Sequence, residues 1–389
     1  MNETVGSSLN RIQFIALIVG VVAAVLCVLG AFLTGQQFFQ SYLFAFLFWM
    51  QFSLGCLGLM MVHHLTGGRW GFGIRRLLEA ASMTLPLMAL LFVPLLFGLS
   101  DIYGWADRAK VAKDPILQYK SAYLNPPFFI VRYVLYFVIW FVVAWLLRSW
   151  SLRQDRTGEP ILTRRMRLLS RGGLVVYVLT VTFATVDWGM SLEPEWTSTI
   201  YAAIYITGQG LMALALAVIV STALRERVSL PEMVSADRFQ DLGSLMLAFI
   251  ILWAYMSFSQ LLIMWSGNLP EEVVWYVHRT TGAWKIIVVL LMLIHFLFPL
   301  LLLLSRDLKR RPQALALVAT LLIVAHLIYL WWMIEPAFYQ TGLHISWLDL
   351  VAPIAIGGFW IAVFVWQLQG KPLLPRRDPR FQEAFAHEH

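Results

Sequence analysis

Ten stretches of mainly apolar residues follow one another along the chain, and they restrict its fold more than any other feature. A helix needs about 20 such residues to cross the hydrocarbon core of a bilayer. With 60% hydrophobic and 13% charged residues, the chain carries more apolar surface than a water-soluble core can bury. We therefore predict an all-α integral membrane protein with about ten transmembrane helices. The expected spans cover residues 12–34, 40–62, 79–99, 127–148, 172–190, 198–222, 242–265, 284–305, 313–334 and 347–368.

Prolines indicate where the predicted helices bend. Pro86 and Pro94 interrupt the third span, which is the weakest of the ten. Pro299 and Pro353 predict bends in the eighth and tenth helices, because proline removes one backbone hydrogen bond of a helix. Such bends are tolerated in membranes where neighbouring helices pack around them.

The basic residues are distributed unevenly between the two sides of the predicted membrane. Of the 29 Lys and Arg residues, 22 lie on the side of the N-terminus and five on the opposite side. Because basic loops remain in the cytoplasm, both termini are predicted to be cytoplasmic. The basic residues form short blocks between the spans, so the net charge of +7 does not indicate a nucleic-acid partner. We expect one transmembrane domain, residues 1–389, with a polar cytoplasmic tail, residues 369–389, that contacts a partner or is mobile.

The two cysteines bear on which cofactors the chain can bind. Cys27 and Cys56 both lie inside apolar stretches, and no CxxC or CxxCH sequence occurs. The sequence therefore gives no basis for an iron–sulfur cluster, a c-type haem or another metal bound directly. It also shows no nucleotide fingerprint and no nucleophile–base constellation, so no catalytic residue is predicted.

Four ionisable residues lie near the outer ends of predicted spans: Arg132, Asp187, Lys285 and Asp349. A charge inside a bilayer is costly, so each one requires a partner or a function. They can form a cluster of ion pairs, which could also bind a quinone. Alternatively, Arg132, Lys285 and Asp349 extend their side chains to the membrane interface.

Two histidines, His295 and His326, lie near the middle of the eighth and ninth spans. Side chains of this kind can accept and pass on a proton, so the pair is a candidate for a proton path. Two other interpretations are a hydrogen bond to a neighbouring helix and a pair of haem b ligands. His63, His64 and Glu79 lie at the cytoplasmic ends of helices. Hydroxyl and amide groups that could extend the path belong to Tyr177, Tyr205, Gln209, Gln260 and Tyr329.

Acidic residues also occur in three outer connections, and we expect them to be solvated or bound to a partner subunit. They are Glu193 and Glu195, Glu271 and Glu272, and Glu335. The longest outer connection, residues 100–126, mixes acidic and basic residues and is a candidate docking surface.

Several polar-patterned segments resemble a known family. Residues 182–200 read TFATVDWGMSLEPEWTSTI, residues 253–260 read WAYMSFSQ, and residues 263–272 read IMWSGNLPEE, followed by WYVHR at 275–279. HFLFP at 295–299, LSRDLKR at 304–310 and WMIEP at 332–336 complete the set. Together they resemble the ActF subunits of alternative complex III, a bacterial quinol:electron acceptor oxidoreductase. ActF is similar to the NrfD/PsrC family of membrane subunits.

The resemblance implies ten helices, with helices 2–5 and 6–9 in two four-helix bundles and helices 1 and 10 beside them. It implies a bacterial cytoplasmic-membrane complex, respiratory or photosynthetic, with haem c and iron–sulfur clusters in other subunits and quinol as a substrate. The implied partners are an ActC-like NrfD-family subunit, a multihaem cytochrome c, an iron–sulfur protein and small membrane anchors.

The family motifs place their polar positions on specific residues of this chain. Asp187, Glu193 and Glu195 fall on the Asp-Trp…Glu-Pro motif, and His295 falls on the motif of the eighth helix. The Pro-Glu-Glu…His-Arg motif corresponds to Glu271, Glu272, His278 and Arg279. Glu195 stands where the family pattern has histidine, so relay of protons by an imidazole at that position is in doubt.

Three functions follow as hypotheses. The first is a subunit without its own redox metal in a quinol:cytochrome c (or other periplasmic acceptor) oxidoreductase, which contributes to proton translocation and complex stability and, as a further option, binds quinone. The second is a stand-alone secondary transporter with a site between two bundles. The third is a purely structural membrane anchor of the same complex.

Overall fold

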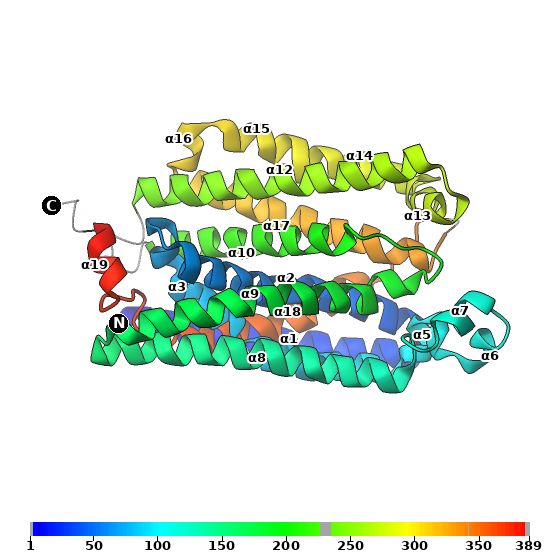
Figure 1. Ribbon diagram of the computed structural model, residues 1–389, viewed down its shortest axis with the longest axis horizontal. Helices are drawn as coiled ribbons and strands as arrows, with labels where there is room; N and C mark the ends of the chain where they lie inside the picture. Colours follow the sequence, from blue (N-terminus) through cyan, green and yellow to red (C-terminus); the bar gives the residue numbers. More distant parts are fainter. Residues whose placement is uncertain (1–2, 226–234, 341, 386–389) are drawn as a thin grey trace.

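A computed structural model describes residues 3–225, 235–340 and 342–385 of the chain. The described residues are helical without any β-strand, and ten helices are long and apolar enough to cross a membrane (Figure 1). The predicted all-α membrane fold and each of the ten spans are confirmed. The spans are α1 (Glu3–Thr34), α2 (Gln36–Thr66), α3 (Arg69–Ser82) with α4 (Leu85–Phe97), α8 (Pro126–Thr157), α9 (Pro160–Trp188), α10 (Tyr201–Arg225), α12 (Ala236–Gly267), α14 (Trp284–Leu291) with η3 (Met292–Leu297) and α15 (Phe298–Leu304), α17 (Pro312–Ile334) and α18 (Leu348–Leu368).

Short helices lie at the two ends of the bundle. We call the end that carries α19 (Pro379–Phe385), α16 (Arg306–Lys309) and the start of α1 the terminal end (Figure 1). The opposite end, the loop end, carries the remaining short helices. These are α5 (Leu99–Ile102), α6 (Arg108–Val111), α7 (Pro115–Lys120) and α13 (Pro270–Thr280).

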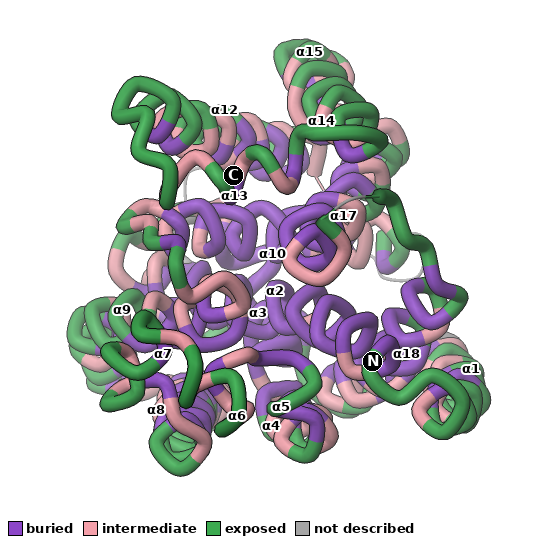
Figure 2. Tube along the Cα trace, turned by 90° about the vertical axis from the view of Figure 1, so that its right-hand side faces the viewer, coloured by how far each residue is buried: buried purple, intermediate pink, exposed green. Residues whose placement is uncertain are grey.

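The spans form two four-helix bundles that share a central contact, as the family resemblance implied. The first contains α2, α3 with α4, α8 and α9, and the second contains α10, α12, α14 with α15, and α17. Helices α2 and α10 lie side by side in the middle of the molecule, and their residues are mostly buried (Figure 2). A Cβ at Gly55 would lie 2.0 Å from the backbone oxygen of Gln209, so glycine is required for this close approach.

Helices α1 and α18 pack against each other and flank α2. Their backbones approach most closely at Gly20 and Gly358, where a Cβ on Gly358 would lie 2.4 Å from the Cα of Gly20. Most of the remaining surface of α1 is apolar and exposed, as expected for a helix in contact with lipid (Figure 2).

The prolines mark local departures from regular α-helix. The third span breaks between Ser82 and Leu85, immediately before Pro86. In the eighth span a π-helical turn, η3, precedes Pro299, whose missing N–H leaves a helix carbonyl without its usual donor. In α18 the carbonyl of Pro353 accepts a hydrogen bond of 2.7 Å from the Trp49 indole.

The polar tail docks on its own chain. Asp378 is fully buried and accepts a hydrogen bond of 2.7 Å from Arg75 of α3, while Phe381 packs edge-on against Phe72. Arg380 donates to the backbone oxygen of His64. The described part of the tail, which we expected to contact a partner or to be mobile, thus packs on its own chain and supplies both a counter-charge and apolar side chains to α3.

Candidate functional site

Arg132 and Asp187 form a closed ion pair between α8 and α9 near the loop end. The guanidinium donates to both carboxylate oxygens at 2.8 Å, and the Tyr136 hydroxyl donates to Oδ2 at 2.9 Å. A third Arg132 donor reaches the backbone oxygen of Tyr123, whose ring covers the guanidinium at 3.9 Å. Both charged side chains are buried, so the pair is satisfied within the protein rather than extended to the interface.

The other two members of the expected four-residue cluster lie elsewhere. Lys285 is exposed at the start of α14. Asp349 is buried at the start of α18, where it accepts hydrogen bonds from Ser41 (2.5 Å), the Ser346 backbone (2.9 Å) and the Trp331 indole (3.3 Å). The predicted cluster therefore does not form, because α18 packs on α1 and α2, away from the ion pair of α8 and α9.

Glu335 was expected to be solvated or bound to a partner subunit, but it is fully buried within its own chain at the loop end of α17. Neither of its carboxylate oxygens has a hydrogen-bond partner among the described residues. It lies one helical turn beyond Trp331, which contacts Asp349. Glu335 and Asp349 thus place two carboxyl groups in the interface of α2, α17 and α18.

The two outer acidic motifs meet at the loop end. Glu193 forms a hydrogen bond of 2.9 Å with His278 Nδ1 and an ion pair of 2.6 Å with Arg279. Arg279 is buried, lies over the Trp275 ring at 4.0 Å, and donates to the backbone oxygen of Met333. This set joins α13 to α17 and to the connection before α10. Glu195 and Glu271 are exposed and Glu272 is half-buried, so these three stay outside the set.

His295 and His326 face each other in the second bundle. His295 Nε2 and His326 Nδ1 are 3.1 Å apart, and the rings stack with centroids separated by 5.2 Å. Both residues are buried, and His295 lies in the π-helical turn η3. This direct hydrogen bond leaves no space for a haem between the two rings. The remaining nitrogens, His295 Nδ1 and His326 Nε2, have no partner in the described part of the chain.

The histidine pair borders a group of buried polar atoms on the central helices. His326 packs on Gly208 of α10, where a Cβ would lie 2.8 Å from the imidazole. Tyr205 lies one turn before Gly208 on the same face, and its hydroxyl faces the side chain of Gln51 on α2. Gln51 is fully buried, and neither side chain makes a close hydrogen bond to a described residue. Since α2 and α10 run in the same direction and touch at Gly55 and Gln209, Gln51 and Tyr205 lie at the same depth, one turn towards the loop end.

Further polar groups lead from the centre to the terminal end. The Tyr177 hydroxyl donates to Gln209 at 2.5 Å, across the contact of α9 with α10. His63 and His64 are buried at the end of α2, and their four ring nitrogens lack partners within the described ranges. Beside them lies an ion-pair network of Arg75, Arg76, Glu79, Asp155 and Asp378. We call Gln51, Tyr177, Tyr205, Gln209, His295 and His326 the central polar group.

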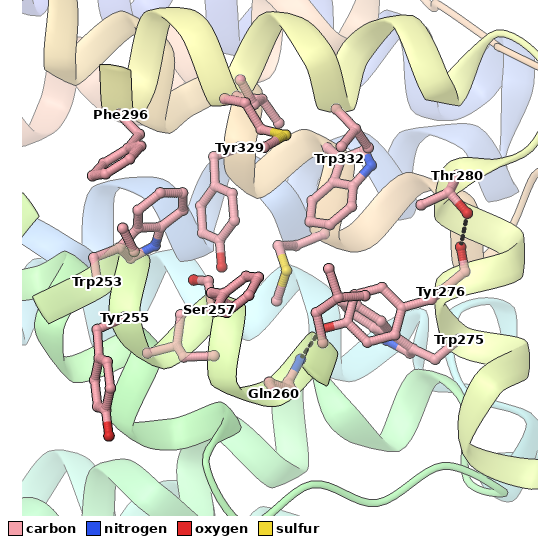
Figure 3. A pocket seen from close by; sticks show the side chains of 18 of the residues that line it. Trp253, Tyr255, Ser257, Gln260, Trp275, Tyr276, Thr280, Phe296, Tyr329 and Trp332 are labelled. Atoms are coloured by element: carbon pink, nitrogen blue, oxygen red, sulfur yellow. Dashed lines mark hydrogen bonds between the residues drawn. The ribbon is translucent and has the colours of Figure 1, made fainter. Parts of the chain in front are cut away.

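The second bundle also contains a cavity of about 500 Å³, and Figure 3 shows side chains that line it. It lies in the loop-end half of the second bundle, between α12, α13, α14 and α17. Its walls include Trp253, Tyr276, Tyr329 and Trp332. Trp253 meets His295 edge-on with ring centroids 4.3 Å apart, and Tyr329 stacks on His295 at 5.6 Å. Trp253 and Tyr329 therefore separate the cavity from the histidine pair.

Gln260 belongs to this cavity rather than to the histidine pair. Its oxygen accepts from Ser198 at 2.8 Å, and its nitrogen donates to the Tyr276 hydroxyl at 3.1 Å. In the sequence, the segment from Trp253 to Gln260 is recognisable as a polar motif within an apolar helix. Nothing in its pattern predicts a cavity, because the cavity depends on the separation of α12 from α14.

No protein-family model matches this chain, and no curated protein matches it significantly. Among the described residues, no group of three or more His, Cys, Asp or Glu side chains is placed to hold a metal ion.

Proposed function

We propose that this chain is a membrane subunit, without a redox metal of its own, of a quinol-oxidising complex of the alternative complex III type. Its role in that complex is to conduct protons and to stabilise the membrane part. The observation that carries the proposal is the central polar group, a set of buried polar side chains around a histidine pair in mid-membrane, several of whose nitrogen and oxygen atoms make no close hydrogen bond among the described residues.

Unpaired polar groups inside a membrane protein are expensive. Each buried donor or acceptor without a partner costs about 1–3 kcal/mol. A protein that only anchors a complex gains nothing from this cost, and apolar side chains would serve it better. Internal water molecules can satisfy such groups, and water between imidazole, phenol and amide groups is what a proton path requires. The central polar group therefore supports proton conduction over a purely structural role.

The positions of these groups support a path that extends to both membrane faces. The carboxyl pair Glu335 and Asp349 lies near the loop end, the histidine pair in the middle, and His63 and His64 near the terminal end. The Arg132–Asp187 pair is closed by its own hydrogen bonds, so we assign it to stability.

A stand-alone transporter fits the packing less well. Transporters of that class hold their substrate between two bundles that move against each other. Here the bundles meet at Gly55 and Gln209 in direct backbone contact, which leaves no room for a substrate. The cavity of about 500 Å³ lies within the second bundle instead.

The proposal places the chain in a bacterial cytoplasmic membrane with its termini in the cytoplasm. The loop end would then face the redox subunits, namely a multihaem cytochrome and an iron–sulfur protein, and the ActC-like subunit would lie beside it in the membrane. The exposed side chains of α6 and α7, with Tyr119 87% exposed, supply a surface for such contacts.

Purification of the native assembly tests the subunit assignment. An affinity tag on the chain, followed by mild detergent extraction, is expected to recover a multihaem cytochrome and an iron–sulfur subunit in stoichiometric amounts. Recovery of the chain alone under conditions that preserve other membrane complexes of the same cells would contradict the proposal.

A further inference from the structure

The aromatic cavity opens sideways to the lipid. On α12 its lining includes Tyr255 and Phe258, which are 66% and 62% exposed, and on the facing span it includes Met292, which is 62% exposed. Side chains that line a cavity and also face the membrane define a lateral mouth. The mouth lies between α12 and the α14–η3 segment, because α12 packs on α15 and α16 only towards the terminal end. A ligand can therefore enter from the bilayer without passing through water.

The interior of the cavity carries polar atoms without partners. Trp253 is buried, and its indole N–H faces the Tyr329 hydroxyl without making a close hydrogen bond to any described residue. The Ser257 hydroxyl is also buried and unpaired. Figure 3 shows Tyr329 and Ser257 pointing into the same part of the cavity. An apolar wall with a few convergent polar groups is typical of a site for a small, flat, partly polar ligand.

Tyr276 provides a further donor at the loop-end side. Its oxygen accepts from Gln260, so its own proton remains for a ligand. Burial raises the pKa of Tyr276 to about 12, although the hydrogen bond from Gln260 acts in the opposite direction. The phenol therefore keeps its proton at physiological pH.

We propose that this cavity binds the ring of a membrane quinone, with the isoprenoid tail leaving through the mouth between α12 and α14. Carbonyl oxygens of a quinone accept hydrogen bonds from the Trp253 indole, the Ser257 hydroxyl and the Tyr276 phenol. The rings of Trp253, Tyr329 and Trp332 provide stacking surfaces. A lipid acyl chain fits the apolar walls but leaves the three donors unpaired. The choice of a quinone rests on the proposed function, whereas the cavity and its mouth do not.

The site is separate from the ion-pair region in which the sequence suggested a quinone. Arg132 and Asp187 belong to the first bundle, and their donors and acceptors are occupied by each other and by Tyr123 and Tyr136. The quinone ring in the second bundle would lie against Trp253 and Tyr329, which both contact His295. Binding would thus occur one side chain away from the histidine pair.

A matched pair of tryptophan substitutions on α14 tests the site. Val288 lines the cavity, whereas Ile286 is 63% exposed and does not line it. The full-length chain in lipid nanodiscs is titrated with decylubiquinone and, separately, with a naphthoquinone carrying a short isoprenoid tail. We expect Val288→Trp to abolish saturable binding and Ile286→Trp to leave the dissociation constant unchanged. Equal binding by the two variants would overturn the proposal.

Two further measurements separate a quinone from a lipid chain. Trp253→Phe removes the indole N–H and keeps an aromatic ring, so we expect up to a tenfold weaker binding of decylubiquinone, as for the loss of one hydrogen bond of about 1.4 kcal/mol. A spin-labelled phosphatidylcholine should not compete with the quinone. Competition by the phospholipid, with no effect of Trp253→Phe, would assign the cavity to an acyl chain and overturn the inference. The co-purification result for the complex is independent of either outcome.

Discussion

At the scale of single residues, the ion pair of Arg132 and Asp187 shows how a membrane protein can hold two charges without exposing them. Each charge has the other as its partner, and the remaining hydrogen-bonding capacity is used by Tyr136 and the Tyr123 backbone. Such a buried pair contributes little more to the stability of the fold than an apolar contact would. The loss of one member, however, leaves the other charge buried without a counter-charge. The pair therefore holds α8 against α9, because separating the two helices would leave two buried charges without partners.

Replacement of Arg132 should reveal this cost. We expect Arg132→Ala to destabilise the folded chain by about 3–5 kcal/mol, because Asp187 is left buried without a counter-charge. The control is Arg153→Ala, which removes the exposed partner of Glu159 and should cost no more than about 1 kcal/mol. The measurement is unfolding by SDS, followed by circular dichroism. Similar midpoints for the two variants would show that the buried pair has no special role.

The sequence predicts which single residues are candidates for a functional site, but it does not predict which side chains they contact. The mid-membrane depth of His295 and His326 follows from their place in the spans, but their mutual hydrogen bond depends on how two helices are rotated. Glu335 has the sequence context of a loop acid. It is buried because the short helix η4 (Glu335–Ala337) continues α17 and remains within the packed loop end.

At the scale of helices, small residues and prolines decide how closely the elements approach. Gly55 brings α2 against α10, and the Gly20–Gly358 contact brings α1 against α18. Apolar length predicts the spans well, because it depends on composition alone. The positions of the break before Pro86 and of the π-helical turn before Pro299 are predictable, whereas α18 continues through Pro353. The separation of α12 from α14 is not predictable, because no local sequence pattern encodes the distance between two helices. The cavity depends on this separation.

The Gly55 contact makes a prediction about the central interface. In Gly55→Ala the new methyl group would lie 2.0 Å from the Gln209 oxygen, so α2 and α10 must move apart. We expect a loss of about 1–3 kcal/mol, as for other overpacked sites. Gly172→Ala on α9 is the matched control, because a Cβ there meets nothing within 4 Å and alanine favours a helix. Thermal unfolding in detergent compares them, and equal melting temperatures would refute the close contact.

The docked tail makes a second prediction at this scale. Burial alone would raise the pKa of Asp378, but Arg75 and Arg380 hold it below its usual range. A lowered pKa means that the contribution of Asp378 to docking is present above pH 3.8 and is lost as the pH falls below that value. We therefore expect the tail to stay docked from neutral pH to about pH 5.

Asp378→Asn should release the tail at neutral pH, because Arg75 loses a charged partner. Limited trypsin digestion measures this as faster cleavage after Lys371, Arg376 or Arg377. Glu383→Gln is the control, since this acid is exposed on the same tail. If the Asn and Gln variants are cleaved at the same rate as the unmodified chain, Asp378 does not hold the tail.

At the scale of the whole molecule, polar groups extend across a bundle that is otherwise apolar. The carboxyl pair near the loop end, the central polar group and the histidines near the terminal end occupy successive depths. Many large apolar side chains are exposed along the spans around them. In the function that we propose, these groups belong to a subunit of a quinol-oxidising complex, and the cavity in the second bundle that we propose as a quinone site lies beside them.

The ratio of protons translocated to electrons transferred, measured on the purified complex in sealed vesicles, tests proton conduction most directly. His326→Leu removes the central imidazole, and Val324→Leu changes a lipid-exposed residue of the same helix as a control. We predict that His326→Leu lowers the ratio while electron transfer from quinol continues, and that Val324→Leu retains the ratio of the unmodified complex. An unchanged ratio in His326→Leu, with normal assembly, would contradict the role of the central polar group in proton conduction.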